Sequence, residues 1–462
     1  MYSSPHPHAA LPGRLLIVGT GCVAEGFLPL LWRHIAVARE RVALLGPDPQ
    51  GQALAARHGI SCHACALSAE SHAAELARHL RAGDVLLNLA LGAGSLDLLA
   101  WCLRHDVLYL DTNLEPWSGQ AHSLAGARSR ALAMRGQSTA VVSHGANPGL
   151  VTHLLKQALQ QLVPDAANWP QAARRLGLQV LQISEVDSHR SAVQTSEAAA
   201  AGTRPPAEFA NTWSALGLAG ELCAPAELAW GAQEYALPAG AVLREGGRGG
   251  AVELAGAALA TRVAGWSPGT GPFTGWLLAH HEAMSMADLL TEHASDVVAG
   301  QGVVVPLRPT VFYAVQPCPA AVQGASALVA PSPPAGCYYR ILKEELMSGG
   351  TDLGVLLLGE RVGHWYGSRL TLAQARKCAP DNNAATLQVA AGVLGALVWA
   401  LENPRRGVVE AEDMDHRRVL AVAAPYLGEL AAIETPWRPP GKGPLRFERF
   451  LVGSQTGRDH NR

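Results

Sequence analysis

A short glycine-rich segment near the start of the chain has the residue types and spacing of a nucleotide-binding turn. The segment is Gly19-x-Gly21-x-x-Ala24, and it follows the apolar run at residues 14–18. Small residues at these positions let the backbone approach a pyrophosphate at the N-terminus of the helix that follows. A purely structural turn is the alternative, but a strand before the motif and a helix after it favour nucleotide binding.

Two glutamates follow apolar runs that are typical of buried strands. Glu115 comes after the run at residues 108–110, and Glu185 comes after the run at residues 178–181. Most glutamates are solvated surface charges, but the clefts of parallel sheets form at the ends of strands. A carboxylate placed there could hold a cation or accept its proton.

The segments around these residues alternate between strand and helix patterns. We expect strands at residues 14–18, 42–45, 84–89, 107–110 and 139–143, and helices from the glycine motif through Trp32 and at residues 70–81, 95–104 and 150–162. This alternation predicts an α/β fold with a Rossmann-type, doubly wound parallel sheet. The acidic residue expected after the second strand for an adenine ribose is missing at Gly46, and the nearest candidate is Asp48.

From about residue 180 the pattern changes to short strands and turn-rich segments such as residues 246–250. It predicts an α+β domain with a mainly antiparallel sheet. Residues 191–206 and 320–336 are rich in small residues and proline, so we expect mobile loops there. Residues 384–402 predict a long core helix that ends at Asn403-Pro404.

Composition argues against several classes of partner. The net charge of −2 and the isoelectric point near 6.8 give no field that would attract nucleic acid or a membrane surface. The apolar run at residues 387–401 is shorter than a membrane span, and the first residues lack the pattern of a signal peptide. We therefore expect a cytoplasmic protein. A lone Cys62-x-x-Cys65 lacks further ligands, so we expect no metal.

Three stretches add specificity to this outline. They are Asp111-Thr112-Asn113-Leu114-Glu115-Pro116-Trp117, His144-Gly145-Ala146-Asn147-Pro148-Gly149 and Asn211-Thr212-Trp213-Ser214. Together they resemble the bacterial homospermidine synthases, and the resemblance runs from about residue 15 to residue 437. Shorter similar segments lie at residues 95–98, 101–102, 225–228, 280–283, 308–310, 353–357, 365–368 and 399–404.

The resemblance implies a saccharopine-dehydrogenase-like fold, a homodimer and a retained NAD that takes a hydride from one diamine and returns it to an imine formed with a second. The implied substrate is putrescine, with spermidine as a possible donor, and NAD rather than NADP is part of the same implication. We therefore expect a disordered start at residues 1–13, an NAD-binding domain at 14–149, a substrate and dimerisation domain at 150–383, a helical return to the first domain at 384–452 and a flexible tail at 453–462.

The resemblance also implies the site residues. The substrate residues would be three carboxylates, an aromatic platform for a cation, an amide near the nicotinamide and a histidine: Glu115, Glu185, Glu221, Trp213, Asn147 and His280. The residues expected at the cofactor are Gly19, Thr20, Gly21, Cys22, Val23, Asp48, Asn88, Leu89, Asp111, Thr112, Ala146, Asn147 and Pro148. From the residues alone, Trp213 could equally fill the core and His280 could be a satisfied core histidine.

Two departures from the family pattern keep other functions open. The loop at residues 91–94 is neutral where the family usually has an acidic residue, and Thr351-Asp352 stands in place of an acidic pair. One alternative is a saccharopine- or carboxyspermidine-type NAD(P)-dependent dehydrogenase, which would need Arg or Lys for substrate carboxylates; Arg190, Arg262 and Arg308 are the candidates. The other is a nucleotide-binding relative without turnover.

Overall fold

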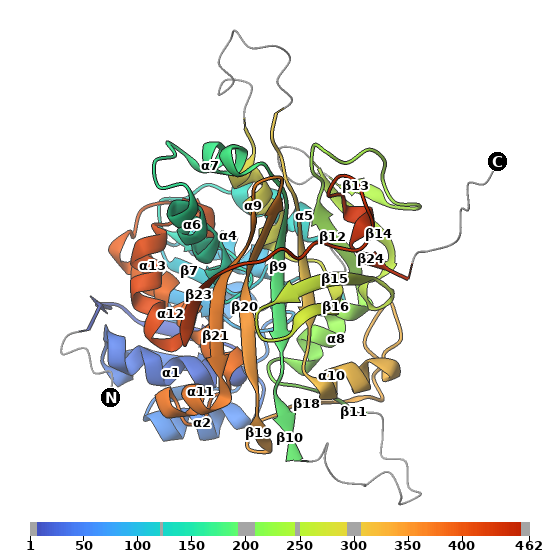
Figure 1. Cartoon of the computed structure of the whole chain (residues 1–462). Helices are drawn as coiled ribbons and strands as arrows, with labels where there is room; N and C mark the ends of the chain where they lie inside the picture. Colours follow the sequence, from blue (N-terminus) through green and yellow to red (C-terminus); the bar gives the residue numbers. More distant parts are fainter. Residues whose placement is uncertain (1–6, 121–122, 193–207, 245–249, 293–305, 454–462) are drawn as a thin grey trace, which may run out of the picture.

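A computed structural model describes residues 7–120, 123–192, 208–244, 250–292 and 306–453, and it contains two large sheets (Figure 1). The first sheet has seven strands in the order β22-β8-β7-β6-β2-β4-β5, and every neighbouring pair is parallel. Its strands are β2 Leu15–Val18, β4 Val42–Leu45, β5 Ser61–His63, β6 Val85–Asn88, β7 Leu108–Asp111, β8 Ala140–Val141 and β22 Val408–Val409. The predicted Rossmann-type sheet is confirmed.

The register of this sheet brings three strand ends to one edge. Val18 at the end of β2 lies beside Leu45 of β4 and Asn88 of β6. The loops that follow these strands therefore begin side by side, as in other nucleotide-binding sheets. The connecting helices are α1 Cys22–His34, α2 Gln50–His58, α3 His72–His79, α4 Ser95–Arg104, α5 Leu124–Ala133 and α6 Leu150–Leu162.

The second sheet has eleven strands, and its pairs are antiparallel except for one. The parallel pair is β9 Leu178–Asp187 with β17 Thr310–Gln316. The other strands are β12 Pro225–Ala229, β13 Val242–Arg244, β14 Ala251–Ala257, β15 Arg262–Ser267, β16 Gly271–Leu278, β20 Gly350–Gly359, β21 Gly363–Thr371, β23 Glu429–Glu434 and β24 Leu451–Val452. The mainly antiparallel second domain is confirmed.

Strand β9 is buried from Val180 onward although it carries the polar residues Gln182, Ser184, Glu185 and Asp187. Gln182 donates to the carbonyl of Ala264 at 2.9 Å, and Ser184 donates to the carbonyl of Trp266 at 2.8 Å. These hydrogen bonds satisfy the Ser184 hydroxyl and the amide N–H of Gln182. Because successive residues of a strand point to opposite faces, Glu185 and Asp187 lie on the other face of β9.

Helix α12, Ala384–Glu402, packs against α1 and contacts β7 and β8 of the first sheet and β20 of the second (Figure 1). By length and composition it could cross a membrane, but most of it is buried in the protein interior. It begins at a capping box made by Asn383 and Thr386. It is thus a core helix, with the bounds that its sequence predicts.

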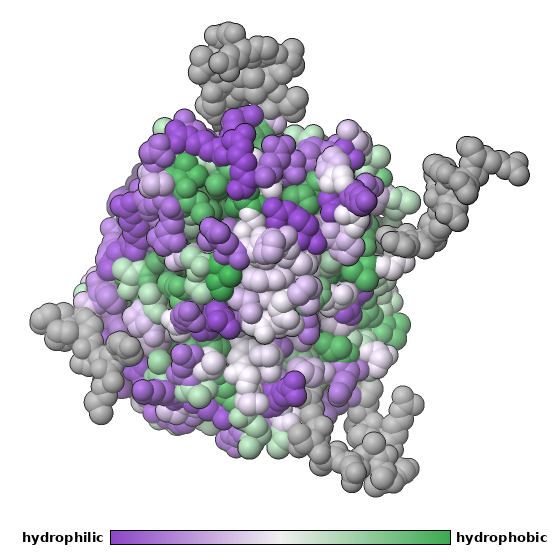
Figure 2. Space-filling view, in the orientation of Figure 1, coloured by the Kyte–Doolittle hydropathy of each residue, from purple (hydrophilic) through white to green (hydrophobic). Residues whose placement is uncertain are grey.

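The chain after α12 contributes strands to both sheets. Helix α13, His416–Ala423, packs on α12 and α6, and β22 completes the parallel sheet beside β8. Strands β23 and β24 join the second sheet instead. Figure 2 shows hydrophilic and hydrophobic residues intermixed over the face that these strands share in this view.

Several sequence expectations need correction or cannot be followed. Residues 7–13 are not a disordered start, because β1 Ala9–Ala10 pairs with β3 Ile35–Ala36, a contact between distant segments that local composition cannot reveal. The expected loop at 320–336 begins as helix, with α10 Pro319–Gly324 and the 3-10 turn Ala325–Ala327. The expectations for residues 193–206, for 246–249 and for the tail after residue 453 lie outside the described residues.

Candidate active site

A cavity of about 510 Å³ lies at the carboxyl-terminal edge of the parallel sheet. One end is formed by the loops after β2, β4 and β6, including Asp48. The other end is formed by the second domain and the first turns of α12, including Glu185 and Gln388. The loops after β7 and β8 join the two ends. The lining therefore combines the loops of the parallel sheet with groups from the second domain.

The glycine motif forms a cradle at the cofactor end. Gly19 has a φ of +100°, and a Cβ there would lie 2.8 Å from the carbonyl carbon of Leu89, so this position requires glycine. Gly21 is the residue before α1, it lines the cavity, and a Cβ there would meet no atom within 4 Å. The helix N-terminus has no side-chain cap and faces this space. These features fit a pyrophosphate.

The other residues predicted at the cofactor line the same cavity, with one exception. Asp111 is fully buried; its carboxylate accepts from the backbone N–H of Ser143 at 2.6 Å and from the hydroxyl of Tyr109 at 2.7 Å. Burial raises the pKa of Asp111 to about 7. Its side chain thus ties β7 to the segment after β8, and the prediction that it contacts the cofactor is corrected. A carboxylate at a strand end can turn either way, and sequence does not say which.

Glu185 is the most enclosed carboxylate of the cavity. The hydroxyl of Tyr313 donates to its Oε2 at 2.6 Å, and the side-chain amide of Asn147 donates to the same oxygen at 2.9 Å. Burial raises the pKa of Glu185, and these two hydrogen bonds oppose that rise. Glu185 is therefore a fixed acceptor that joins β9, β17 and the loop after β8.

Glu115 and Glu221 form the more open acidic wall. The amide of Asn113 donates to Glu115 at 3.0 Å. Burial, followed by the charge of Glu221, raises the pKa of Glu115 to about 7. One carboxylate oxygen of Glu221 is buried without a hydrogen-bond partner among the described residues. A cation entering the cavity would meet two carboxylates whose charges oppose each other in its absence.

His280 stands between carboxylates and an aromatic ring. It is the residue before helix α9, His281–Leu290, and its Nδ1 donates to Glu282 at 3.1 Å. Its Nε2 lies 3.8 Å from Glu221, and its ring lies 4.1 Å from that of Tyr313, centroid to centroid. Burial alone would lower the pKa of His280, but Glu282 and Glu221 outweigh it and raise the pKa to about 10. His280 is thus protonated at neutral pH.

Trp213 completes the lining from the opposite wall. It follows β11, Glu208–Asn211, and precedes Ser214, whose hydroxyl accepts from the N–H of Gly217 and caps helix α8, Ala215–Cys223. The indole is half-buried and faces the cavity, and α8 carries Glu221. All six substrate residues predicted from the sequence therefore line one cavity; their individual roles stay predictions.

Sequence reasoning missed Tyr313, Asn113 and Gln388, which also line the cavity. Tyr313 lies inside the apolar strand β17, so nothing local distinguishes its hydroxyl from that of a core tyrosine. Asn113 lies in a stretch that the resemblance already covered. Gln388 is the polar residue within the apolar run of α12, and this contrast is the sequence signal that could have identified it as a site residue.

The described lining contains no lysine or arginine. Arg308 pairs with Asp288 at 2.9 Å, Arg262 stacks on the ring of Trp276, and Arg190 is exposed outside the cavity. Of the two family departures, Leu91 lines the cavity and is 46% exposed, whereas Thr351 and Asp352 do not reach it. Within the described segments, no group of three His, Cys, Asp or Glu side chains could hold a metal ion.

Comparisons with known proteins agree with this geometry. The model of the saccharopine dehydrogenase NADP binding domain matches residues 15–141, and that of the saccharopine dehydrogenase C-terminal domain matches residues 145–434. Homospermidine synthases from Blastochloris viridis and Mesorhizobium japonicum are 36% and 34% identical to this chain, each over 98% of it and 97% of their own length.

A solved structure is also similar. The homospermidine synthase of Legionella pneumophila in complex with NAD superposes with a TM-score of 0.84 at 31% identity, covering 96% of this chain and 99% of that one. The resemblance inferred from the sequence motifs is confirmed over nearly the whole length. The chain belongs to the saccharopine dehydrogenase family and, within it, to the homospermidine synthases.

Proposed function

We propose that this chain is an NAD-using transferase that moves the aminobutyl group of one putrescine onto a second, giving homospermidine and ammonia. Spermidine would serve as an alternative donor and release 1,3-diaminopropane. The observation that carries the proposal is one cavity with a glycine cradle at one end and Glu115, Glu185 and Glu221 at the other. An acidic cavity without Lys or Arg in its described lining suits a dication.

NAD fits the cofactor end better than NADP. The matching family model is described as NADP binding, whereas the similar Legionella protein is in complex with NAD. A 2′-phosphate needs a nearby arginine or lysine, and an acidic residue after the second strand suits a free 2′-hydroxyl. Asp48 lines the cavity three residues after β4, and the described lining holds no cation other than His280. These features support NAD.

The acidic end supports diamine binding in two ways. Its carboxylates can take the two ammonium groups, and Trp213 can face the cation with its ring, an attraction of about 0.5–2 kcal/mol. A bound ammonium near Glu115 and Glu221 also relieves the repulsion that raises the pKa of Glu115 in the free protein. Binding the diamine thus adds positive charge beside two carboxylates, of which only Glu221 has the nearby charge of His280.

The proton steps follow from the state of each group. The bound cofactor supplies the acceptor and donor of the hydride, and only a neutral amine can lose hydride from its α-carbon. Glu115, with a pKa near 7, can accept the proton of the reacting ammonium. His280 is already protonated, so it acts as a charge that holds Glu221 and Glu282 in place rather than as the first base.

The remaining chemistry balances without an external oxidant. The oxidised donor is an imine, the amine of the second putrescine attacks its carbon, and ammonia leaves to form a secondary imine. Return of the same hydride to that imine gives homospermidine. Both imines carry positive charge when protonated, and Glu185, fixed by Tyr313 and Asn147, provides a preorganised negative group for them.

The alternatives have less support. A saccharopine- or carboxyspermidine-type dehydrogenase binds substrate carboxylates, for which the described lining offers three glutamates and no arginine or lysine. A relative without turnover would be favoured by the neutral Leu91 at the cavity, but the acidic and aromatic groups of the diamine end are all in place. The cytoplasmic location and the homodimer stay predictions.

The decisive experiment incubates the purified protein with putrescine and a trace of NAD. Mass spectrometry follows homospermidine, an enzymatic assay follows ammonia, and absorbance follows NADH. Homospermidine in large molar excess over the NAD supplied is the expected result, because each hydride is returned. NADH that accumulates in step with amine consumption would identify a dehydrogenase instead, and no change in any of the three would support the relative without turnover.

A further inference from the structure

A buried polar network lies directly behind the diamine end of the cavity. Its centre is Asp187, the last residue of β9, two positions beyond Glu185 and only 3% exposed. Residues two apart on a strand point to the same side. One oxygen of Asp187 accepts from the backbone N–H of His189 at 2.9 Å and from its Nδ1 at 2.7 Å. The other accepts from the hydroxyl of Thr212.

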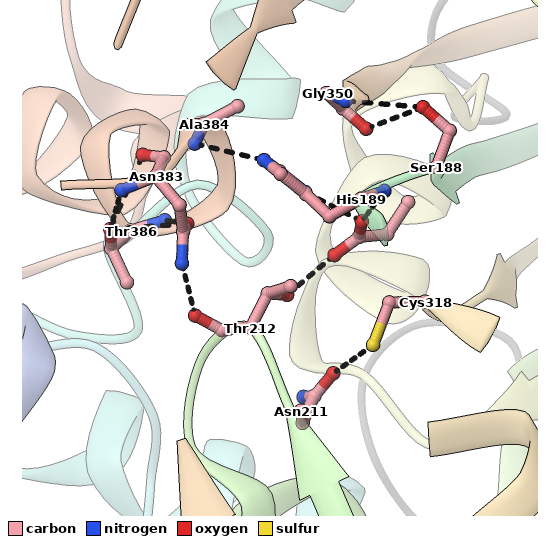
Figure 3. A network of polar contacts seen from close by, with 10 residues as sticks. Ser188, His189, Asn211, Thr212, Cys318, Gly350, Asn383, Ala384 and Thr386 are labelled. Atoms are coloured by element: carbon pink, nitrogen blue, oxygen red, sulfur yellow. Dashed lines mark hydrogen bonds and ion pairs between the residues drawn. The ribbon is translucent and has the colours of Figure 1, made fainter. Parts of the chain in front are cut away.

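The hydrogen bonds fix the tautomer of His189. Its Nδ1 must carry a proton, because the carboxylate of Asp187 is only an acceptor. Its Nε2 accepts from the backbone N–H of Ala384 at 3.4 Å, so that nitrogen carries none. Figure 3 shows the ring of His189 reaching toward Ala384 at the start of α12. The ring therefore links β9 to the helix whose first turns line the cavity.

The same network holds the residue before Trp213 from two sides. The hydroxyl of Thr212 donates to Asp187, and the carbonyl of Thr212 accepts from the side-chain amide of Asn383 at 2.6 Å (Figure 3). Asn383 in turn caps α12, accepting from the N–H of Thr386 at 2.9 Å. The hydroxyl and the backbone carbonyl of Thr212 are thus each hydrogen-bonded to an element that carries another cavity residue. These are Glu185 on β9 and Gln388 on α12.

We propose that Asp187 is a positioning residue that, through Thr212 and His189, fixes Trp213 and the first turn of α12 relative to Glu185. Asp187 does not line the cavity and touches no substrate. Asp187 thereby holds the indole of Trp213 and the carboxylate of Glu185 in one fixed position relative to each other. The part of the proposal that concerns diamine binding rests on the proposed function; the part that concerns the position of Trp213 does not.

The test uses a mild variant because Asp187→Asn would place an amide hydrogen against buried donors and could unfold the protein. Thr212→Val removes one donor to Asp187 at similar volume, and Thr212→Ser restores the hydroxyl. Ser188→Ala is the matched control: it removes a hydroxyl in the same turn whose hydrogen bonds, among the described residues, are to the backbone of Gly350 at 3.0 and 3.1 Å (Figure 3).

Two readouts separate this proposal from the proposed function. The first is fluorine NMR of protein labelled with 5-fluorotryptophan, in which Trp213→Phe identifies one resonance among those of 11 tryptophans. The second is steady-state kinetics with putrescine, together with NAD binding. In Thr212→Val we expect the Trp213 resonance to shift or broaden and the KM for putrescine to rise about fivefold, with NAD affinity within about twofold of wild type.

Thr212→Ser should return the resonance and the KM to wild-type values, and Ser188→Ala should lower only the thermal stability. A Trp213 resonance unchanged in Thr212→Val, or changed equally in Ser188→Ala, would overturn the proposal. So would a moved resonance with an unchanged KM in an enzyme that turns over putrescine. If the wild type makes no homospermidine, the proposed function fails, and the resonance alone still decides whether Asp187 positions Trp213.

Discussion

The two ends of the cavity are built in different ways. At the cofactor end the surface is formed mainly by the backbone. Gly19 has a conformation that needs glycine, and Gly21 leaves open space before α1. At the diamine end, side chains from separate elements meet, such as Glu185 on β9 and His280 before α9. A backbone site is encoded in a few adjacent residues, whereas a side-chain site exists only after the fold has brought the elements together.

The ends also differ in electrostatics. The cofactor end offers helix N–H groups and one carboxylate, Asp48, in its lining. The diamine end brings three glutamates and a protonated histidine close enough to change one another, as the pKa values of Glu115, about 7, and His280, about 10, demonstrate. Substitutions at the cofactor end should therefore change binding through the space and shape of the site. Substitutions at the diamine end should change binding and catalysis through charge.

The largest effect should come from Glu221→Gln at the diamine end. This change removes one of the two carboxylate partners of His280 and one of the charges that face a diamine, leaving the charge of His280 less compensated. Truncating one member of such a pair costs about 2–5 kcal/mol, so we expect kcat/KM for putrescine to fall about a hundredfold or more. NAD affinity, measured by calorimetry, should stay close to that of wild type. An equal loss in both would erase the distinction between the two ends.

Gly21→Ala should produce the converse result, a loss of NAD affinity of about tenfold to a hundredfold. Gly21 has a φ of −79°, which alanine tolerates, and its Cβ would meet no protein atom, so the protein without cofactor should unfold at the same temperature. The methyl group would occupy the space that fits the pyrophosphate. Gly220→Ala is the control, because a Cβ there also meets nothing but lies on α8 outside the cavity lining.

How far the sequence predicts these two ends follows from the same difference. Strands β2, β4, β6 and β7 and helices α4, α6 and α12 have local signals, so their predicted bounds agree closely with the structure; β5, α2 and α5 were not predicted. The resemblance to the family predicted that the six substrate residues belong to one site. Their types and spacing alone did not predict this. Tyr313 lies inside an apolar strand, and the sequence did not identify it as a site residue. The residues that its hydroxyl faces depend on how β17 pairs with β9.

Asp111 and Asp187 illustrate the limit more sharply. Each is an aspartate at the end of a buried strand, and Asp111 was predicted from the sequence to lie at the cofactor. Asp111 turns inward to Tyr109 and Ser143, and Asp187 turns to Thr212 and His189. In each case one donor is two residues away in the sequence and the other, Ser143 or Thr212, comes from a remote segment. No local pattern records the remote donor.

The pH dependence should show an intermediate effect. Because burial and Glu221 raise the pKa of Glu115 to about 7, its ionised form is lost as the pH falls through that value. If Glu115 is the base, kcat/KM should fall about tenfold between pH 8 and pH 6. In Glu221→Gln the residual activity should keep its acid limb but at lower pH, because a negative neighbour has been removed.

The same shift has a consequence for stability that checks its sign. The folded protein binds the Glu115 proton more tightly than the unfolded chain, whose carboxyl has the ordinary value of 4.5. Its contribution to stability is therefore greatest at low pH and declines as the pH rises from about 4.5 to 7. Glu115→Gln should remove the Glu115 share of this decline in denaturation measured across that range, whereas the share of Asp111, whose pKa burial also raises to about 7, should remain. A decline that persists unchanged in Glu115→Gln would assign the raised pKa to another group.

The smallest effect should come from adding a charge at Leu91, which lies in the loop after β6 and approaches Gly217 of α8, the helix that carries Glu221. Leu91 lines the cavity and is 46% exposed, so an aspartate there would be hydrated and its attraction for an ammonium screened. Exposed pairs contribute about 0.2–1 kcal/mol, which predicts that Leu91→Asp lowers the KM for putrescine by about twofold to threefold at low salt. Leu91→Asn, polar but uncharged, is the matched control. If the two variants behave alike, or if the gain survives high salt, shape rather than charge governs this wall, and the contrast between the two ends would hold only for the buried carboxylates.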